Sequence, residues 1–461
     1  MALQIETDAV VVGAGSSGAA AACCLAEAGL RVHLLDARPL DRAGATWSDD
    51  LPPWMFDRAR IPRPAWPEAR NHDVPYLLMS PSGGRVRLEA SPMWAVDVRL
   101  LSARLRQGAV DRGAIVSPRT RAGELLCDAD GRPHLLHAEA LDGTRRETRE
   151  YRARLFVDAG GIGGVLRRQV PALARCCPDV GVGDLCSAAQ YVCDIADRSA
   201  AAAFLGRIGA MPGTFMAWAG VNGGFSTCIL HPDDRLDEIG ILTGMAWDGR
   251  TPGARRMMDE LRHQHPWIGP VRFGGEGLIP IRRPYERLSA PGIALVGDAG
   301  CQVFPPSGCG IGSALIASRM LADSVSGHDD PGSIEAMWAY QAAFHRDRGA
   351  VHAAYDVFRR MTQSLSGPEV SGLLECGLMT AGSATAALDQ RMPAMGPGDL
   401  ARTIAGAARR PILAARMSAA LPRMFAVHAA HAFHPARPDE AALRRWSRRV
   451  AALVGDRPGV T

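Results

Sequence analysis

The chain has 461 residues, of which 47% are apolar and 22% charged, and its formal net charge is +4. These are ordinary globular values, and the length exceeds the roughly 250–300 residues of a single core, so two or three lobes are expected. The small charge and the lack of a basic run interleaved with aromatics argue against nucleic-acid binding. No uncharged apolar stretch reaches the roughly 18 residues of a transmembrane helix, and no signal peptide precedes the first predicted strand, so we expect a cytoplasmic protein.

The first informative segment is residues 8–36, which read DAVVVGAGSSGAAAACCLAEAGLRVHLLD. Ala9–Val12 is a short valine-rich run, as expected of a strand buried on both faces of a parallel sheet. Gly13, Gly15 and Gly18 follow at GxGxxG spacing. The first allows a tight turn, the second lets the backbone approach a pyrophosphate, and the third lets a helix pack closely on the strand.

A helix is predicted from about Ser17 to Ala28, where its free N–H groups and its dipole would favour a phosphate. Gly29 ends this helix, and Leu30–Leu35 is expected to form the next strand. Asp36 stands at the end of that strand, where a carboxylate can accept hydrogen bonds from both hydroxyls of an adenosine ribose. Strand, turn, helix and acid together predict a unit that binds the ADP half of a dinucleotide.

Two long segments are expected to build a substrate lobe. Segment 46–94 is rich in proline and tryptophan, which predicts a loop-rich wall. Segment 171–274 holds strand-like runs at Phe225–Leu230 and Ile239–Leu242 among Gly/Pro turns, which predicts a sheet. Together the wall and the sheet would enclose a hydrophobic substrate.

A second cofactor motif lies in residues 292–322, GIALVGDAGCQVFPPSGCGIGSALIASRMLA. Ile293–Val296 is another buried-strand run, and Asp298 follows at its carboxyl end, where ligands sit in open α/β sheets. A carboxylate there suits the ribityl hydroxyls of a flavin better than a nicotinamide ring. A helix that starts near Gly310 would aim its positive N-terminus at the flavin ring or the pyrophosphate.

The last third of the chain is predicted to be helical. Asp329-Asp330-Pro331 has the composition of a helix start, and helical periodicity follows through 336–365 and 400–432. The Arg/Ala/Met stretch 401–424 could lie on a membrane surface. A packed amphipathic helix is the favoured interpretation, with peripheral membrane contact as its alternative.

The eleven cysteines do not form a disulfide or metal framework. No CxxC pair occurs, so we predict no metal or iron–sulfur ligation. Cys23 and Cys24 are expected to pack as small apolar residues. Cys301 and Cys309 flank the proposed flavin loop, where inert thiols are favoured over a redox or covalent role.

Four motifs together resemble the large FAD-dependent oxidoreductase superfamily, which includes para-hydroxybenzoate hydroxylase-type monooxygenases, geranylgeranyl reductases and flavin-dependent halogenases. The first is Gly13–Gly18 with Asp36, and the second is Gly297-Asp298-Ala299 with the loop 305–310. The other two are Asp97-Val98-Arg99-Leu100-Leu101 and Phe156-Val157-Asp158-Ala159-Gly160-Gly161.

The resemblance implies an α/β fold: a Rossmann-like FAD-binding domain (1–45, 95–170 and 275–330), an inserted β-sheet substrate lobe (46–94 and 171–274) and a helical C-terminal region (331–461). It also implies FAD as the cofactor. The residues expected to bind FAD are Gly13, Gly15, Ser16, Ser17, Gly18, Asp36, Ala37, Arg38, Thr46, Arg99, Asp158, Gly160, Gly297, Asp298, Pro305, Gly308, Gly310 and Ile311.

Within this superfamily the first hypothesis is a monooxygenase-like enzyme of specialised metabolism that hydroxylates or epoxidises a hydrophobic or aromatic small molecule. The alternatives are a geranylgeranyl reductase-like reduction of an alkene and a flavoprotein with a non-redox use of FAD. Halogenation is discounted, because the segment around Trp218 lacks the Trp-x-Trp-x-Ile-Pro pattern of halogenases. No second βαβ unit for a nicotinamide is evident, so NAD(P)H is expected to dock transiently or to be replaced by an external reductase.

No catalytic base is assigned from the sequence. By the resemblance, several side chains fall where substrate could bind, although each residue type is more often structural. They are Trp47, Asp49, Asp50, Trp54, Trp218 and Tyr285.

Overall fold

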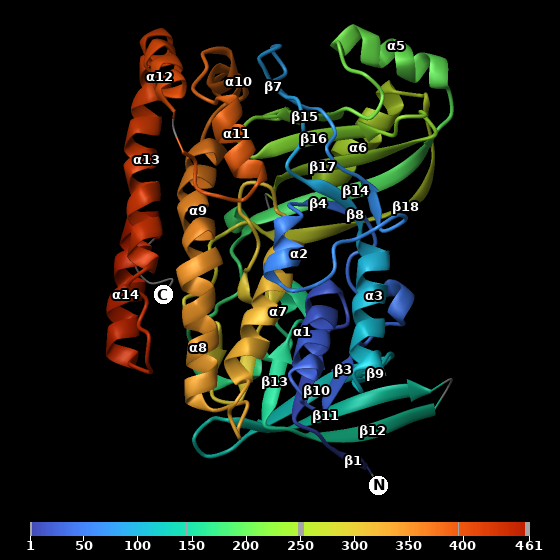
Figure 1. The fold of residues 1–461 in the computed structure, drawn as a ribbon, viewed down its shortest axis with the longest axis vertical. Helices are drawn as coiled ribbons and strands as arrows, with labels where there is room; N and C mark the ends of the chain where they lie inside the picture. The colour runs from blue at the N-terminus through green and yellow to red at the C-terminus, as the bar shows by residue number, and fades with distance from the viewer. Residues whose placement is uncertain (1, 143–144, 248–252, 395, 457–461) are drawn as a thin grey trace.

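The computed structural model describes residues 2–142, 145–247, 253–394 and 396–456. Some residues of the predicted domains lie outside this description, namely 1, 143–144, 248–252, 395 and 457–461. A seven-stranded sheet occupies one end of the molecule, a parallel sheet with its helices the middle, and the C-terminal helices run along one side (Figure 1).

The central sheet has six strands in the order β19-β20-β13-β2-β3-β9. All neighbours are parallel except β19 and β20. Its strands are β2 (Ala9–Val12), β3 (Val32–Leu35), β9 (Ile115–Ser117), β13 (Leu155–Asp158), β19 (Ser289–Ala290) and β20 (Ile293–Leu295). Strands far apart in the sequence thus end at one edge, as in other doubly wound sheets.

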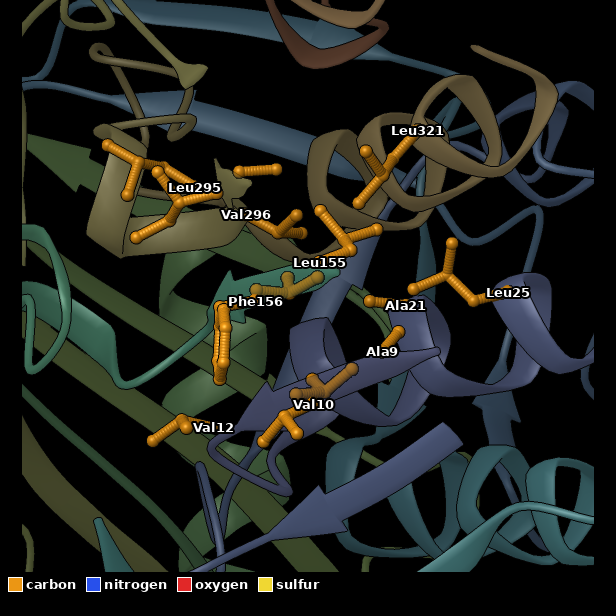
Figure 2. Packing of buried hydrophobic residues seen from close by; sticks show 14 of the residues in the cluster. Ala9, Val10, Val12, Ala21, Leu25, Leu155, Phe156, Leu295, Val296 and Leu321 are labelled. Atoms are coloured by element: carbon orange, nitrogen blue, oxygen red, sulfur yellow. The ribbon is translucent and has the colours of Figure 1, made fainter. Parts of the chain in front are cut away.

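Helices cover this sheet and bury its apolar strands. They are α1 (Ser16–Glu27), α3 (Val98–Asp111) and α7 (Ile311–Val325). Figure 2 shows Ala9 and Leu155 of the sheet on the same side as Leu25 of α1 and Leu321 of α7, whereas Val10 and Phe156 point to the other side. Burial of each such side chain contributes roughly 1.5–3 kcal/mol. The core therefore holds the carboxyl ends of β2, β13 and β20 together.

The seven-stranded sheet has the order β18-β14-β17-β16-β15-β6-β7. Its strands are β6 (Tyr76–Met79), β7 (Arg85–Leu88), β14 (Leu185–Ile195), β15 (Phe215–Ala219), β16 (Ser226–Pro232), β17 (Glu238–Ala246) and β18 (Ile268–Pro280). Two of these strands come from segment 46–94, which the sequence predicted to be a loop-rich wall. That prediction was incomplete, because β6 pairs with β15, whose paired residues lie 139 positions further along the chain.

Segment 46–94 contributes further regular structure. A small sheet of order β4-β8-β5 joins β4 (Ser48–Leu51), β5 (Ala69–Asn71) and β8 (Trp94–Asp97), and the helix α2 (Trp54–Arg58) lies between β4 and β5. The helices near the large sheet are α5 (Arg198–Ile208) and α6 (Gly253–Gln264).

The sequence did not predict a fourth sheet, of order β1-β12-β11-β10. Its strands are β1 (Leu3–Glu6), β10 (Thr120–Cys127), β11 (Pro133–Asp142) and β12 (Arg145–Arg152). Short 3₁₀ helices lie at Leu40–Arg42, Gly161–Gly163, Arg167–Gln169, Val182–Asp184 and Gly297–Gly300. A short α-helix, α4, spans Pro171–Ala174.

The C-terminal region is helical, as predicted. It comprises α8 (Ile334–Phe344), a π-turn (His345–Gly349), α9 (Ala350–Gln363), α10 (Gly367–Glu375), α11 (Ala381–Leu388), α12 (Pro397–Arg409), α13 (Pro411–His431) and α14 (Glu440–Val454). One face of α13 is buried, with Leu413, Met417 and Met424 among its inward side chains. Among the described residues, no helix has both the length and the apolar content needed to cross a membrane. The predicted fold class is confirmed.

Candidate functional site

One cavity of about 900 Å³ connects the central sheet to the seven-stranded sheet. It begins at the glycine turn after β2, passes Asp36 and Asp298, and ends among apolar side chains of α9, α10, α11 and α13. Ligand cavities commonly span about 300–1,000 Å³, so this one is large enough for an extended ligand.

The glycine turn forms a cradle that side chains would fill. A Cβ at Gly15 would lie 2.9 Å from the Cα of Gly44, so the two backbones meet with no room for a methyl group. A Cβ at Gly18 would lie 1.7 Å from the carbonyl oxygen of Gly13, which explains the close packing of α1 on β2. The N-cap position of α1, Gly15, carries no side-chain cap, so the first N–H groups of the helix stay free for an anion.

Asp36 holds the turn from the end of β3. One carboxylate oxygen accepts from the backbone N–H of Ala14 at 2.8 Å, and the other accepts from the N–H of Arg38 at 2.8 Å. Asp36 is part of the cavity lining, and a carboxylate oxygen can accept more than one hydrogen bond, which suits the hydroxyls of a ribose. Arg106 of α3 supports the same turn by donating to the Ala14 carbonyl at 2.9 Å. The sequence analysis missed Arg106, because only the packing of α3 on α1 brings it there.

Asp298 lines the cavity directly after Gly297, which packs against Ser17 at the start of α1. Burial raises the pKa of this carboxyl to about 6. Within the described parts of the chain its side chain has no hydrogen-bond or salt-bridge partner, so its oxygens are available to hydroxyl donors. Gly310 and Ile311 line the cavity beside it, and α7 begins there without a side-chain cap. The N-terminus of α7 therefore offers a positive partial charge to a ligand.

Most of the predicted cofactor-binding residues line this cavity. They are Gly13, Gly15, Ser16, Ser17, Asp36, Ala37, Arg38, Gly160, Asp298, Gly308, Gly310 and Ile311. The other predicted residues do not belong to its lining; these are Gly18, Thr46, Arg99, Asp158, Gly297 and Pro305.

Asp158 organises the wall of the site from behind. Its carboxylate is fully buried and accepts from the backbone N–H groups of Gly160, Leu166 and Arg167 at 2.8–3.0 Å. With its acceptors engaged in this way, it shapes the turn after β13. Gly297 packs against Ser17 in a similar supporting position.

Arg99 is turned toward the small sheet in this structure. It donates to both carboxylate oxygens of Asp97, at 3.1 and 2.7 Å, and its guanidinium lies 3.4 Å from the centroid of the Phe273 ring. Thr46 donates to the Gly274 carbonyl at 2.9 Å. In this structure neither Arg99 nor Thr46 lines the cavity. Their direct contact with the cofactor stays a prediction.

Two of the six residues predicted near the substrate line the cavity, and the other four do not. Trp47 and Asp49 line the cavity. Asp50 lies next to them, whereas Trp54 donates its indole N–H to Asp389 at 2.9 Å. Two further residues are structural: Trp218 packs at the edge of the core between the large sheet and α5 and α6, and the buried Tyr285 accepts from Arg167 and donates to the Pro178 carbonyl.

The sequence predicted a sheet against a hydrophobic substrate, but it did not predict that C-terminal helices complete the apolar end of the cavity. Side chains from the sheet and from four C-terminal helices meet there, and they include Leu242, Phe358, Leu374, Leu378, Leu421 and Phe425. Their apolar character was visible only as helix amphipathicity, which does not say which partner a helix covers.

The residues present fit an extended FAD. Asp36 and Arg38 suit its adenosine, the glycine turn with the start of α1 suits its pyrophosphate, and Asp298 with the start of α7 suits its ribityl and ring end. Within the described ranges, no group of three His, Cys, Asp or Glu side chains is arranged to hold a metal ion.

Comparisons with known proteins agree with this geometry. Residues 11–58 match the family described as "NAD(P)-binding Rossmann-like domain". The chain is 24% identical over 454 residues, 97% of each chain, to a digeranylgeranylglycerophospholipid reductase of Sulfolobus acidocaldarius. It is 29% identical over 332 residues to digeranylgeranylglycerophospholipid reductase 1 of Methanopyrus kandleri, covering 69% of this chain and 80% of that one.

Solved structures show the same fold. A geranylgeranyl bacteriochlorophyll reductase-like protein from Thermoplasma acidophilum superposes with a TM-score of 0.72 at 18% identity, over 90% of this chain and all of that one. A flavin-dependent brominase gives a TM-score of 0.58 at 14% identity, over 88% and 99% of the two chains. The dinucleotide cradle, the Asp298 segment and these relatives together support the assignment of the chain to the FAD-dependent oxidoreductase superfamily.

Proposed function

We propose that this enzyme reduces carbon–carbon double bonds of an isoprenoid chain, with FAD as the redox cofactor. The observation that carries this proposal is the apolar end of the cavity, which continues directly from Asp298 and Gly310. Support also comes from the relatives, which are named digeranylgeranylglycerophospholipid reductases. The sequence alone favoured a monooxygenase and gave alkene reduction as an alternative. We now favour alkene reduction over oxygenation.

The apolar end suits a long hydrocarbon. The sheet floor offers small and branched side chains such as Ala217 and Ile229, and the helices offer Leu374, Leu421 and Met424. Each buried CH₂ group of a ligand gains about 0.8 kcal/mol, so affinity is expected to rise with chain length. In the described lining, the arginines Arg38 and Arg121 both lie at the adenosine end of the cavity, so recognition at the apolar end rests on the hydrocarbon.

FAD, when bound, supplies hydride-transfer chemistry. The protein positions the ring end with Asp298 and the N-terminus of α7, which favours negative charge there. The helices over the sheet exclude water from the reacting double bond. NAD(P)H docking transiently, or an external reductase, is proposed as the electron source.

The test is an anaerobic single-turnover experiment. Purified FAD-loaded protein is reduced with dithionite and mixed with geranylgeraniol, and the absorbance of oxidised flavin and the product mass are followed. We expect oxidised flavin to return without oxygen and the product to gain two hydrogens per turnover. Return of oxidised flavin only with oxygen, together with a product heavier by one oxygen, would support the oxygenase alternative and overturn the reductase.

Two substitutions on α13 test the position of the hydrocarbon. Leu421 lines the cavity, whereas Ile412 on the same helix is 73% exposed. Leu421→Trp should raise the KM for geranylgeraniol more than that for the shorter geraniol, because it fills the far end of the cavity. Ile412→Trp is the matched control and should leave both constants unchanged.

A further inference from the structure

Two adjacent aspartates stand beside the cavity on β4. Asp49 lines the cavity, and its carboxylate accepts from the backbone N–H of Asp50 at 2.8 Å. The thiol of Cys309, one residue before Gly310, donates to the Asp50 carbonyl at 3.0 Å. This contact ties β4 to the loop that begins α7, so Asp49 is held at the flavin-ring end of the site.

The surroundings of this pair favour the protonated carboxyl. Facing it are Asp298 from the segment after β20, the Cys309 thiol and Tyr76 of β6, none of which is a cation. No arginine, lysine or histidine pairs with Asp49 or Asp50 among the described residues. A buried carboxylate without a cation partner is costly, so the pair is expected to retain a proton.

The direction of the pKa shifts agrees with this geometry. Burial raises the pKa of Asp49 to about 6, although the hydrogen bonds from the Asp50 N–H group and the Cys309 thiol lower it; the charge of Asp298 adds a smaller increase. Burial raises the pKa of Asp50 to about 8, and the charge of Asp49 contributes. Because the two groups interact, these values belong to the pair, which keeps one proton between about 6 and about 8.

We propose that Asp49 is the catalytic acid that protonates the substrate double bond, and that Asp50 is a positioning residue that keeps a proton on the pair. This assignment rests on the proposed function and adds the proton source to it. Asp49 is the member of the pair that lines the cavity, whereas Asp50 is not part of the lining and contacts Asp49 through its backbone N–H group.

The step balances in atoms and electrons. One alkene carbon takes a hydride, whose hydrogen and two electrons come from the reduced cofactor. The other alkene carbon takes the proton as the O–H bond of Asp49 breaks. The C=C π bond is lost and two C–H bonds form, so the alkene is reduced and the cofactor is oxidised. Asp49 is left as a carboxylate and regains a proton from solvent through the pair.

The first test compares variants in the anaerobic single turnover. Asp49→Asn should slow the return of oxidised flavin by at least about 100-fold, the range of a lost general acid, while FAD occupancy and dithionite reduction stay normal. Asp49→Glu should recover part of the rate. The wild-type rate should fall as the pH rises through about 8, because the pair then loses its last proton.

The matched control is Asp57→Asn, a change of the same kind at a half-exposed carboxylate on nearby α2. It should leave the rate and its pH profile unchanged. A rate for Asp49→Asn within threefold of wild type, with the same pH profile, would overturn the assignment.

The second test needs no substrate. In protein labelled with ¹³C-aspartate, an NMR titration should show a carboxyl that titrates above pH 5, is missing in Asp49→Asn and is retained in Asp57→Asn. No such carboxyl would overturn the assignment even if alkenes are reduced. If wild-type protein reduces no alkene, the proposed function fails instead, and this titration still decides whether Asp49 holds the proton.

Discussion

Gly18→Ala tests the close packing that builds the cofactor cradle. The added Cβ would lie 1.7 Å from the carbonyl oxygen of Gly13, where ordinary contacts are 3.4–4 Å, so α1 must move away from β2. Overpacking of this kind costs up to about 3 kcal/mol, and the better helix propensity of alanine returns about 1 kcal/mol. The net loss of unfolding free energy is therefore about 2 kcal/mol. Because the start of α1 moves with the helix, FAD should also bind more weakly.

The assay is urea unfolding followed by circular dichroism, with the flavin-to-protein absorbance ratio measured on the same samples. Gly206→Ala is the matched control, because Gly206 lies in α5 and nothing stands within 4 Å of the added Cβ. That control should gain about 0.5–1 kcal/mol from helix propensity. If Gly18→Ala unfolds like the control and keeps its FAD, the described packing of α1 on β2 is wrong.

Three further predictions concern single side chains. Asp298→Ala should lower the FAD content sharply while the circular dichroism spectrum stays native; full flavin occupancy would contradict the role of this carboxylate. Asp158→Leu should cost at least about 1–3 kcal/mol in urea unfolding, because it leaves the buried N–H groups of Leu166 and Arg167 unpaired; unchanged stability would argue against that role. Burial lowers the pKa of His431 from 6.5 to about 3 in the folded protein. Above pH 6.5 His431 is neutral in both states, and below pH 6.5 the free energy of unfolding falls by about 1.4 kcal/mol per pH unit, because only the unfolded chain takes up the proton. His431→Asn should therefore show a smaller drop in melting temperature between pH 7 and pH 5, and an unchanged drop would contradict this linkage.

The sequence predicted the cofactor half well because its signals are local. Ala9–Val12 forms β2 with the bounds expected, and α1 begins within one residue of the predicted Ser17. Asp36 and Asp298 could be placed at the cavity because each follows a buried strand, and the carboxyl ends of such strands meet at one edge; their contact with the cofactor stays a prediction. The start of the C-terminal region was placed less well: Ser333, not the preceding acids, caps α8.

The amino-acid pattern by itself thus determined the fold class, and it predicted FAD as the cofactor and the crevice proposed to hold it. Only the tertiary structure decided which side chains reach it: Arg106 supports the turn, Arg99 points toward Asp97, and Asp158 spends its acceptors on backbone N–H groups. It also placed C-terminal helices over the sheet to form the apolar end of the cavity. The reason is physical, because a local pattern shows that a face is apolar or that a carboxylate ends a strand, whereas the partner of either is set by packing between distant segments.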